Sequence, residues 1–102
     1  MSLFWMLAVT ACDTTPTLPL PPPVAGVEAP DPAGVVTIRG QAQPRSFVAA
    51  LNEARDAGVI GRADAAGDYS LQLAAQPGDA ITVWQFIEAD RSQVVDLVVP
   101  NP

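Results

Sequence analysis

The sequence contains no histidine and no lysine, and its one cysteine is Cys12. A single cysteine excludes an intrachain disulfide. Without histidine the chain cannot form the Ser-His-Asp or Cys-His arrangements of nucleophilic catalysis. A zinc site would have to use carboxylates alone, a ligand set that zinc sites rarely show. We therefore expect a protein that is not an enzyme, has no catalytic residues, needs no cofactor and holds no metal.

Basic charge is scarce. Five arginines stand against 11 acidic residues, which gives a formal net charge of -6 at pH 7, and no run of like charge occurs. Nucleic-acid binding depends on clustered lysine or arginine side chains that contact phosphates. The composition therefore predicts no nucleic-acid partner.

One group of acidic residues has two interpretations. Asp64 and Asp68 flank a predicted turn, and Asp56 precedes them in the chain. Carboxylates can bind calcium, although this spacing does not match an EF-hand loop. They can also accept hydrogen bonds from the backbone amides of the turn. We favour the second interpretation.

The first eleven residues are almost entirely apolar, and the first basic residue of the chain is Arg39. The stretch is too short to cross a bilayer, which takes about 20 residues, but it fits the apolar core of a secretory signal. It ends in Val9-Thr10-Ala11-Cys12, which resembles the lipobox of bacterial lipoproteins: an aliphatic residue, two small residues and cysteine. The alternative is a chance cysteine at the end of a hydrophobic N-terminus.

The resemblance implies cleavage before Cys12 and a diacylglyceryl group on its thiol. Residues 1–11 would then be a signal segment, and Cys12 would be the mature N-terminus and the lipidation site. Two or more acyl chains give a stable membrane anchor. The expected location is the bacterial cell envelope, with the chain bound to a membrane and facing the periplasm or the cell surface.

A proline-rich linker is expected over residues 12–34, which hold seven of the 11 prolines. Proline fixes φ and removes a hydrogen-bond donor, which disfavours helices and central strands. In polyproline-II geometry the chain rises about 3.1 Å per residue, so the linker would reach on the order of 60 Å. We interpret it as a spacer. The alternative is that Pro19 to Pro23 form a ligand for an SH3-type groove.

From residue 35 to residue 100 the sequence changes to short segments with the composition of β-strands. The six candidates are residues 35–40, 45–51, 58–63, 68–73, 80–87 and 94–99. Gln76-Pro77-Gly78-Asp79 suits a type II turn, and Gly67 supplies a residue that tolerates positive φ between two strands. This spacing predicts an all-β sandwich of about six to seven strands.

One of these segments is ambiguous. Residues 46–58 can also be read as a helix that Ser46 caps and Gly58 ends. We favour a strand followed by a loop, because the rest of the domain is β-patterned. In such a strand Phe47, Ala49 and Leu51 share one face.

Two turn motifs suggest a family. The hairpin Asp64-Ala65-Ala66-Gly67-Asp68-Tyr69, followed by Pro77-Gly78-Asp79, looks like a bacterial Ig-like domain and is similar to the carboxypeptidase regulatory-like domain. The resemblance implies a small Ig-like Greek-key β-sandwich over residues 35–100 and says almost nothing about function. Arg45 stands where such domains usually carry a glycine after the proline.

The last two strands carry apolar residues on both faces. If Ile81 and Val83 point into the core, Trp84 and Phe86 point outward, and Val94 and Val98 do the same on the final strand. One interpretation makes Trp84 and Phe86 contacts for a protein or a glycan. The other packs them within the domain.

The function expected from these features is that of a non-enzymatic, envelope-anchored module, a structural, adhesion or assembly element. The alternative is a module that binds envelope polysaccharide or a protein partner through Trp84 and Phe86.

Overall fold

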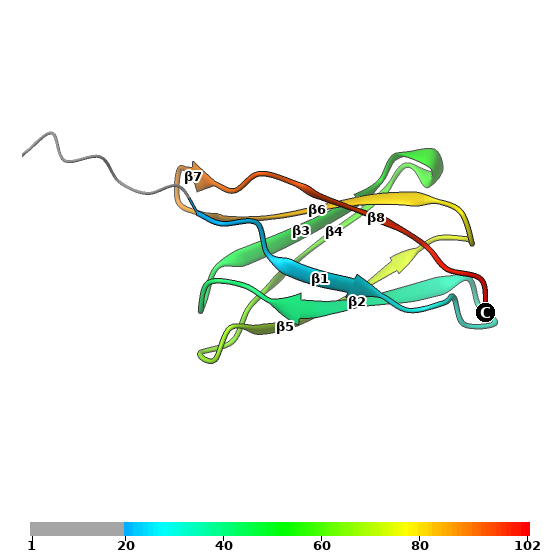
Figure 1. Ribbon diagram of the computed structural model, residues 1–102, viewed down its shortest axis with the longest axis horizontal. Helices are drawn as coiled ribbons and strands as arrows, with labels where there is room; N and C mark the ends of the chain where they lie inside the picture. The colour runs from blue at the N-terminus through cyan, green and yellow to red at the C-terminus, as the bar shows by residue number, and fades with distance from the viewer. Residues whose placement is uncertain (1–19) are drawn as a thin grey trace, which may run out of the picture.

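A computed structural model describes residues 20–102, so the predicted signal segment, Cys12 and the first part of the linker lie outside the described residues. The described chain forms strands, turns and one short 3-10 turn, and no α-helix occurs within it (Figure 1). The elements are β1 (Val24–Val27), β2 (Val35–Gln41), β3 (Phe47–Asn52), η1 (Glu53–Arg55), β4 (Ala57–Arg62), β5 (Asp68–Ala74), β6 (Ala80–Ile87), β7 (Asp90–Arg91) and β8 (Val95–Val98). The all-β prediction is confirmed.

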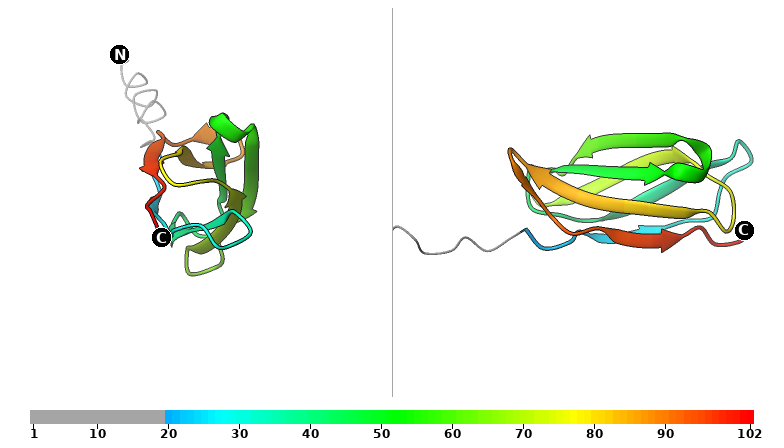
Figure 2. Two further views of the ribbon diagram at one scale, coloured as in Figure 1. Left: turned by 90° about the vertical axis from the view of Figure 1, so that its right-hand side faces the viewer. Right: turned by 90° about the horizontal axis from the view of Figure 1, so that it is seen from above.

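The strands form two antiparallel sheets. One has the order β1-β2-β5, and the other has the order β4-β3-β6, with β7 and β8 pairing with successive parts of β6. The chain passes from one sheet to the other after β2, after β4 and after β5. Figure 2 shows the sheets as two layers with the core between them.

The core consists of side chains that alternate along the facing strands. The three-stranded sheet contributes Val36, Ile38, Tyr69, Leu71 and Leu73, and the five-stranded sheet contributes Val48, Ala50, Ile81 and Val83. Burying one such aliphatic side chain stabilises the fold by about 1.5–3 kcal/mol. Tyr69, Leu71 and Leu73 are buried together on one face of β5, as the alternation of side chains along a strand requires.

Residues 47–52 form a strand, as we favoured, and not a helix. β3 pairs with β4 on one side and with β6 on the other, so both edges of its backbone are used. The chain then turns through η1, where Asp56 takes a left-handed conformation with φ 52°. Ser46, the residue that would cap a helix, is instead buried, and its hydroxyl donates to the side-chain oxygen of Gln85 at 3.0 Å.

The linker prediction needs a correction. Residues 24–27, which we assigned to the linker, form β1 and pair with β2 over the full length of β1. The prolines lie on both sides of this segment and not within it, so its amides remain free to pair. The folded unit therefore begins before residue 24, and the expected domain start at residue 35 is too late.

Two residues of the three-stranded sheet make room for β1. The hydroxyl of Tyr69 donates to the carbonyl oxygen of Val24 at 2.7 Å. A Cβ on Gly40 would overlap the same carbonyl group, so only glycine fits there. Burial also raises the pKa of Tyr69 to about 12, because the charged form is disfavoured away from water.

The predicted turn chemistry is confirmed. Gly78 has φ 90° and the amide of Asp79 donates to the carbonyl of Gln76 at 3.0 Å, as a type II turn requires. Gly67 also has φ 90°. The Asp79 carboxylate accepts from Asn52, from the Gln76 amide and from Arg55, and these bonds lower its pKa to about 2.

Candidate binding surface

The outward side of the five-stranded sheet carries a contiguous set of side chains, all of them large except Ala49. We call this set the aromatic face; it comprises Phe47, Ala49, Leu51, Ile60, Arg62, Trp84, Phe86 and Arg91. The strand register arranges it in cross-strand rows. The first row runs Arg62, Phe47, Phe86, Arg91 across β4, β3, β6 and β7. The second row runs Ile60, Ala49, Trp84.

Planar groups stack on one another along the first row and between the first and second rows. The rings of Phe47 and Phe86 stack with centroids 5.4 Å apart and planes 20° apart. The guanidinium carbon of Arg62 lies 5.1 Å from the centre of the Phe47 ring. On the other side, that of Arg91 lies 4.8 Å from the Trp84 ring. Both arrangements are cation–π contacts, which hold the long arginine side chains flat on the sheet.

Small residues in the neighbouring rows leave a depression beside Trp84. Ala49 and Gly58 form its floor and Leu51, Ile60 and Trp84 line its sides, and this open depression has a volume of about 420 Å³. Ile60 is 63% exposed. The depression has room for one large apolar side chain of a partner, and its lining is almost wholly apolar.

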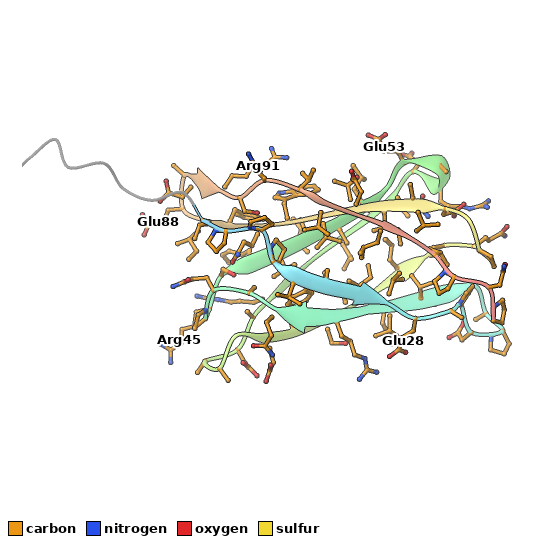
Figure 3. The ribbon with its side chains drawn as sticks, in the orientation of Figure 1. Glu28, Arg45, Glu53, Glu88 and Arg91 are labelled. Carbon is orange, nitrogen blue, oxygen red and sulfur yellow. The ribbon has the colours of Figure 1, made fainter. Side chains whose placement is uncertain are left out.

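The two arginines of this face are not neutralised by an acidic side chain within residues 20–102. Among the described residues the ion pairs are Arg39 with Glu28 and Arg55 with Asp79. Within residues 20–102, neither Arg62 nor Arg91 forms such a pair. Arg62 donates through Nε to the backbone carbonyl of Arg45 at 3.0 Å. Figure 3 shows Arg91 projecting from the side of the sandwich away from β1 and β2.

The structure places the predicted contact residues as follows. Trp84 and Phe86 are half-buried and lie on the outward side of β6, whereas Ile81 and Val83 belong to the core. Trp84 and Phe86 are partly buried because they pack against other side chains on the outward side of the sheet, and neither side chain belongs to the core. On the final strand segment, Val94 and Val98 are exposed. Cys12, the predicted lipidation site, lies outside the described residues.

The acidic residues near the β4–β5 turn bind their own backbone. Asp64 accepts hydrogen bonds from the amides of Ala66 and Asp68, both at 2.9 Å. The Asp68 carboxylate accepts from the side chain of Gln41. Asp56 lies at the other end of β4. In the part of the chain that the structure describes, no group of three or more potential ligands is placed to hold a metal ion.

A hollow lies on the outer side of β2 and β5. Its volume is about 520 Å³, and its lining includes Arg39, Arg62, Asp64 and Asp68. Arg39 is paired with Glu28, and both aspartates are held by the hydrogen bonds just described.

Gln85 is the structurally important residue that the sequence reasoning missed. It is 1% exposed. Its side-chain oxygen accepts from the Gln43 amide at 2.8 Å and from the Ser46 hydroxyl, while its nitrogen donates to the carbonyl of Pro21 at 2.6 Å. The signal was present, because the alternation that buries Ile81 and Val83 also turns Gln85 inward.

No protein-family model matches this chain, and no curated protein sequence matches it. The described residues also contain no helix with the length and apolar character needed to cross a membrane.

Proposed function

We propose that this chain is a lipid-anchored module of the bacterial cell envelope, attached to a membrane through Cys12, that acts without catalysis as a structural, adhesion or assembly element. The observation that carries this proposal is the aromatic face. Contiguous apolar surface with a polar rim marks a site of protein interaction. Trp84, Phe86 and Phe47 form such a surface, and Arg62 and Arg91 stand at its two ends.

The way the chain enters the sandwich supports a role for the lipid anchor in positioning. Residue 20 enters beside the β6–β7 turn, and the C-terminus lies at the opposite end (Figure 1). Pro21 is already bound to Gln85. The nine residue steps from Cys12 to Pro21 span at most about 30 Å. This is half of the reach, on the order of 60 Å, that a linker over residues 12–34 would have. The anchor would thus hold one end of the sandwich close to the membrane and leave the aromatic face on its flank.

For the domain itself we propose the Ig-like Greek-key class. The support is the resemblance of the turn motifs, together with a connectivity in which the chain changes sheet three times. The left-handed conformation of Arg45, with φ 65°, also fits, because such domains usually carry glycine at this position.

A second candidate function is binding of envelope polysaccharide through Trp84 and Phe86. The partly exposed indole ring of Trp84 favours it, because sugars pack their apolar faces on aromatic rings. However, the guanidinium of Arg91 already lies over the Trp84 ring. The ring face that a sugar would use is therefore partly covered, and we favour a protein partner.

Cross-linking on intact envelopes followed by affinity purification tests the proposal. The parent chain is compared with Trp84→Ala and with a matched control, Gln72→Ala, whose side chain is exposed on β5 of the other sheet. We expect a partner that is recovered with the parent and with Gln72→Ala but lost with Trp84→Ala. Identical recovery with all three chains would contradict a function of the aromatic face.

A further inference from the structure

We infer that the aromatic face binds a second copy of this chain, related to the first by a twofold axis that runs across the strands. This inference rests on the proposed function, since it names the partner of the same face. Three features of the face support it: the order of its residues along the strands, the shape of the depression beside Trp84 and the positions of its charged groups.

The aromatic face changes in character along its strands. The first two rows hold the rings and the arginines. The next row runs Gly58, Leu51, Thr82, Asp96 across β4, β3, β6 and β8, so it carries smaller side chains and an acid. Beyond it, on the line of β3, Glu53 begins η1. A twofold axis between the second and third rows therefore turns the large, basic half of one copy onto the small, acidic half of the other.

The depression beside Trp84 is complementary to its own rim under this operation. Second and third rows exchange places, so Ile60 of one copy stands over Gly58 of the other, and Leu51 stands over Ala49. Gly58 and Ala49 are the residues at the floor of the depression. Sheets that pack face to face lie about 10 Å apart with their strands roughly aligned, which is the arrangement that this axis produces. The exposed Ile60 side chain thereby leaves water.

The guanidinium of Arg91 corresponds to an acid of the second copy. It lies over the Trp84 ring, in the second row of β6. The axis turns this position onto the third row of β6 in the second copy, where Thr82 lies. The hydroxyl of Thr82 donates to the Asp96 carboxylate at 3.3 Å, so this carboxylate is close to the incoming guanidinium. Arginine and carboxylate form charge-assisted hydrogen bonds in such a contact.

The guanidinium of Arg62 has a corresponding acid as well. It lies over the Phe47 ring, in the first row of β3. The axis turns this position onto the line of β3 beyond Leu51, where Glu53 of the second copy lies. Figure 3 shows Glu53 and Arg91 projecting from the same side of the sandwich. The ion pairs within residues 20–102 use neither these two arginines nor Glu53 or Asp96, so all four groups are available to a partner.

Charge selects the orientation of the two copies. The net charge of -6 opposes association at long range, but the Debye length is about 8 Å at physiological ionic strength, so the groups in direct contact have the larger effect. In the antiparallel arrangement each arginine of the face meets an acid. A parallel arrangement would bring the two basic halves together. Complementary charges of this kind contribute more to specificity than to affinity.

The contact is small, which predicts a weak dimer. Four strands and four rows cover roughly 14 Å by 20 Å, less than the footprint of a standard interface, about 800 Å² per partner. We expect a dissociation constant on the order of 100 µM, as in transient interfaces. The linkers enter at opposite ends of this dimer, because the strands run antiparallel. A linker span of up to about 30 Å still allows both copies to reach one membrane.

Sedimentation velocity of the full chain, from micromolar to millimolar concentration, tests the inference. Every chain carries Cys12→Ser, so that no disulfide joins two copies. We expect the parent to dimerise and Arg91→Asp to weaken the dimer at least fivefold, because a carboxylate then faces Asp96 of the second copy. The matched control is Arg39→Asp, which changes the net charge by the same amount on the other sheet, where Arg39 pairs with Glu28. Its dissociation constant should stay within twofold of the parent.

Two further measurements separate a twofold contact from damage to the fold. Asp96→Arg alone should also weaken the dimer at least fivefold, but an equimolar mixture of Asp96→Arg and Arg91→Asp should form heterodimers with the affinity of the parent, because two guanidinium groups then face two carboxylates. Gly58→Val should weaken the dimer at least fivefold by occupying the space of Ile60 of the second copy. Its Cβ would come no closer than 3.5 Å to any neighbour, so the monomer has room for it.

A parent chain that stays monomeric up to millimolar concentration would overturn the inference. Equal association of Arg91→Asp and Arg39→Asp, or a mixture of the two charge variants that does not recover affinity, would do the same. If an envelope protein other than this chain still depends on Trp84 in the cross-linking experiment, the proposed function stands and only the identity of the partner fails. If the purified chain dimerises as described but no cross-link in the envelope depends on Trp84, the dimer stands and the proposed function fails.

Discussion

The side-chain amide of Gln85, in the middle of β6, donates a hydrogen bond of 2.6 Å to the carbonyl oxygen of Pro21, 64 residues earlier in the chain. This bond joins the end of the proline-rich segment to the interior of the five-stranded sheet. Gln85 also accepts from the Gln43 amide and the Ser46 hydroxyl. One buried side chain therefore fixes the point at which the linker enters the domain, and with it the orientation of the aromatic face.

Gln85→Leu should destabilise the fold by about 3 kcal/mol. The substitution keeps the volume but leaves the buried Ser46 hydroxyl and the part-buried Pro21 carbonyl and Gln43 amide without their partner. An unsatisfied buried group costs about 1–3 kcal/mol, and a part-buried one costs less because water can reach it. Urea unfolding measures the change. Gln72→Leu, an exposed glutamine on β5, serves as control and should stay within about 0.5 kcal/mol of the parent. Equal stabilities of the two variants would show that the Gln85 hydrogen bonds contribute nothing.

Gly40→Ala should release β1 from the sheet, because the added Cβ would collide with the backbone of Val24. Gly26→Ala is the matched control: it lies in β1 itself, and its Cβ would come no closer than 4.0 Å to the carbonyl oxygen of Arg39. Hydrogen exchange of the β1 amides should accelerate at least tenfold in Gly40→Ala and remain slow in Gly26→Ala. Unchanged exchange in both would mean that β1 is not held as the structure shows it.

Stability should fall as the pH rises above 10, and Tyr69 should be the cause. An unfolded tyrosine loses its proton near pH 10, whereas burial raises the pKa of Tyr69 in the folded chain to about 12. Between these values the unfolded state releases a proton that the folded state retains, so the contribution present below pH 10 is lost as the pH rises to 12. The chain has one tyrosine and no lysine, so neither a second phenol nor an ammonium side chain titrates in this range.

Urea unfolding at pH 9 and pH 11 measures this loss. The free energy of unfolding of the parent should drop between the two, and that of Tyr69→Phe should drop less. Tyr69→Phe should also be less stable at pH 9 by about 1 kcal/mol, because the bond to the Val24 carbonyl is gone. The assignment fails if the two chains lose the same stability between pH 9 and pH 11.

Arg45 should tolerate glycine better than a β-branched residue. Its φ of 65° lies in the left-handed region, which costs an L-residue about 1–2 kcal/mol. Arg45→Gly removes that strain, and its larger unfolded-state entropy offsets part of the gain, so we expect a melting temperature equal to or above that of the parent. Arg45→Val should melt several degrees lower. The opposite order would show that this turn is not strained.

Local sequence patterns were sufficient to predict most of the strands and turns of the sandwich. The alternation in Asp68 to Leu73 and the turn residues Gly67 and Gly78 depend only on neighbouring residues, and the structure has them as expected. Local sequence patterns did not decide between a strand and a helix for residues 47–52. It was decided by pairing with β4, which follows after a short turn, and with β6, which begins only at Ala80.

β1 and Gln85 were missed for the same physical reason. A short segment between prolines has no strand signal of its own, and it becomes β1 only because Gly40 and Tyr69 accommodate it. A buried glutamine looks unfavourable until its partners, Pro21 and Ser46, are known. The aromatic face was predicted only in part. Trp84 and Phe86 follow from alternation along β6, but the arginines that flank the first row depend on cross-strand register.

The mass of the mature N-terminus tests the central claim of an anchored module most directly. The full chain is expressed in a bacterium, the membrane fraction is isolated, and the N-terminal peptide is analysed by mass spectrometry beside a Cys12→Ser variant. The account predicts a peptide that begins at Cys12 and carries a diacylglyceryl group, absent from the variant. An intact Met1 with an unmodified thiol at Cys12 would contradict it.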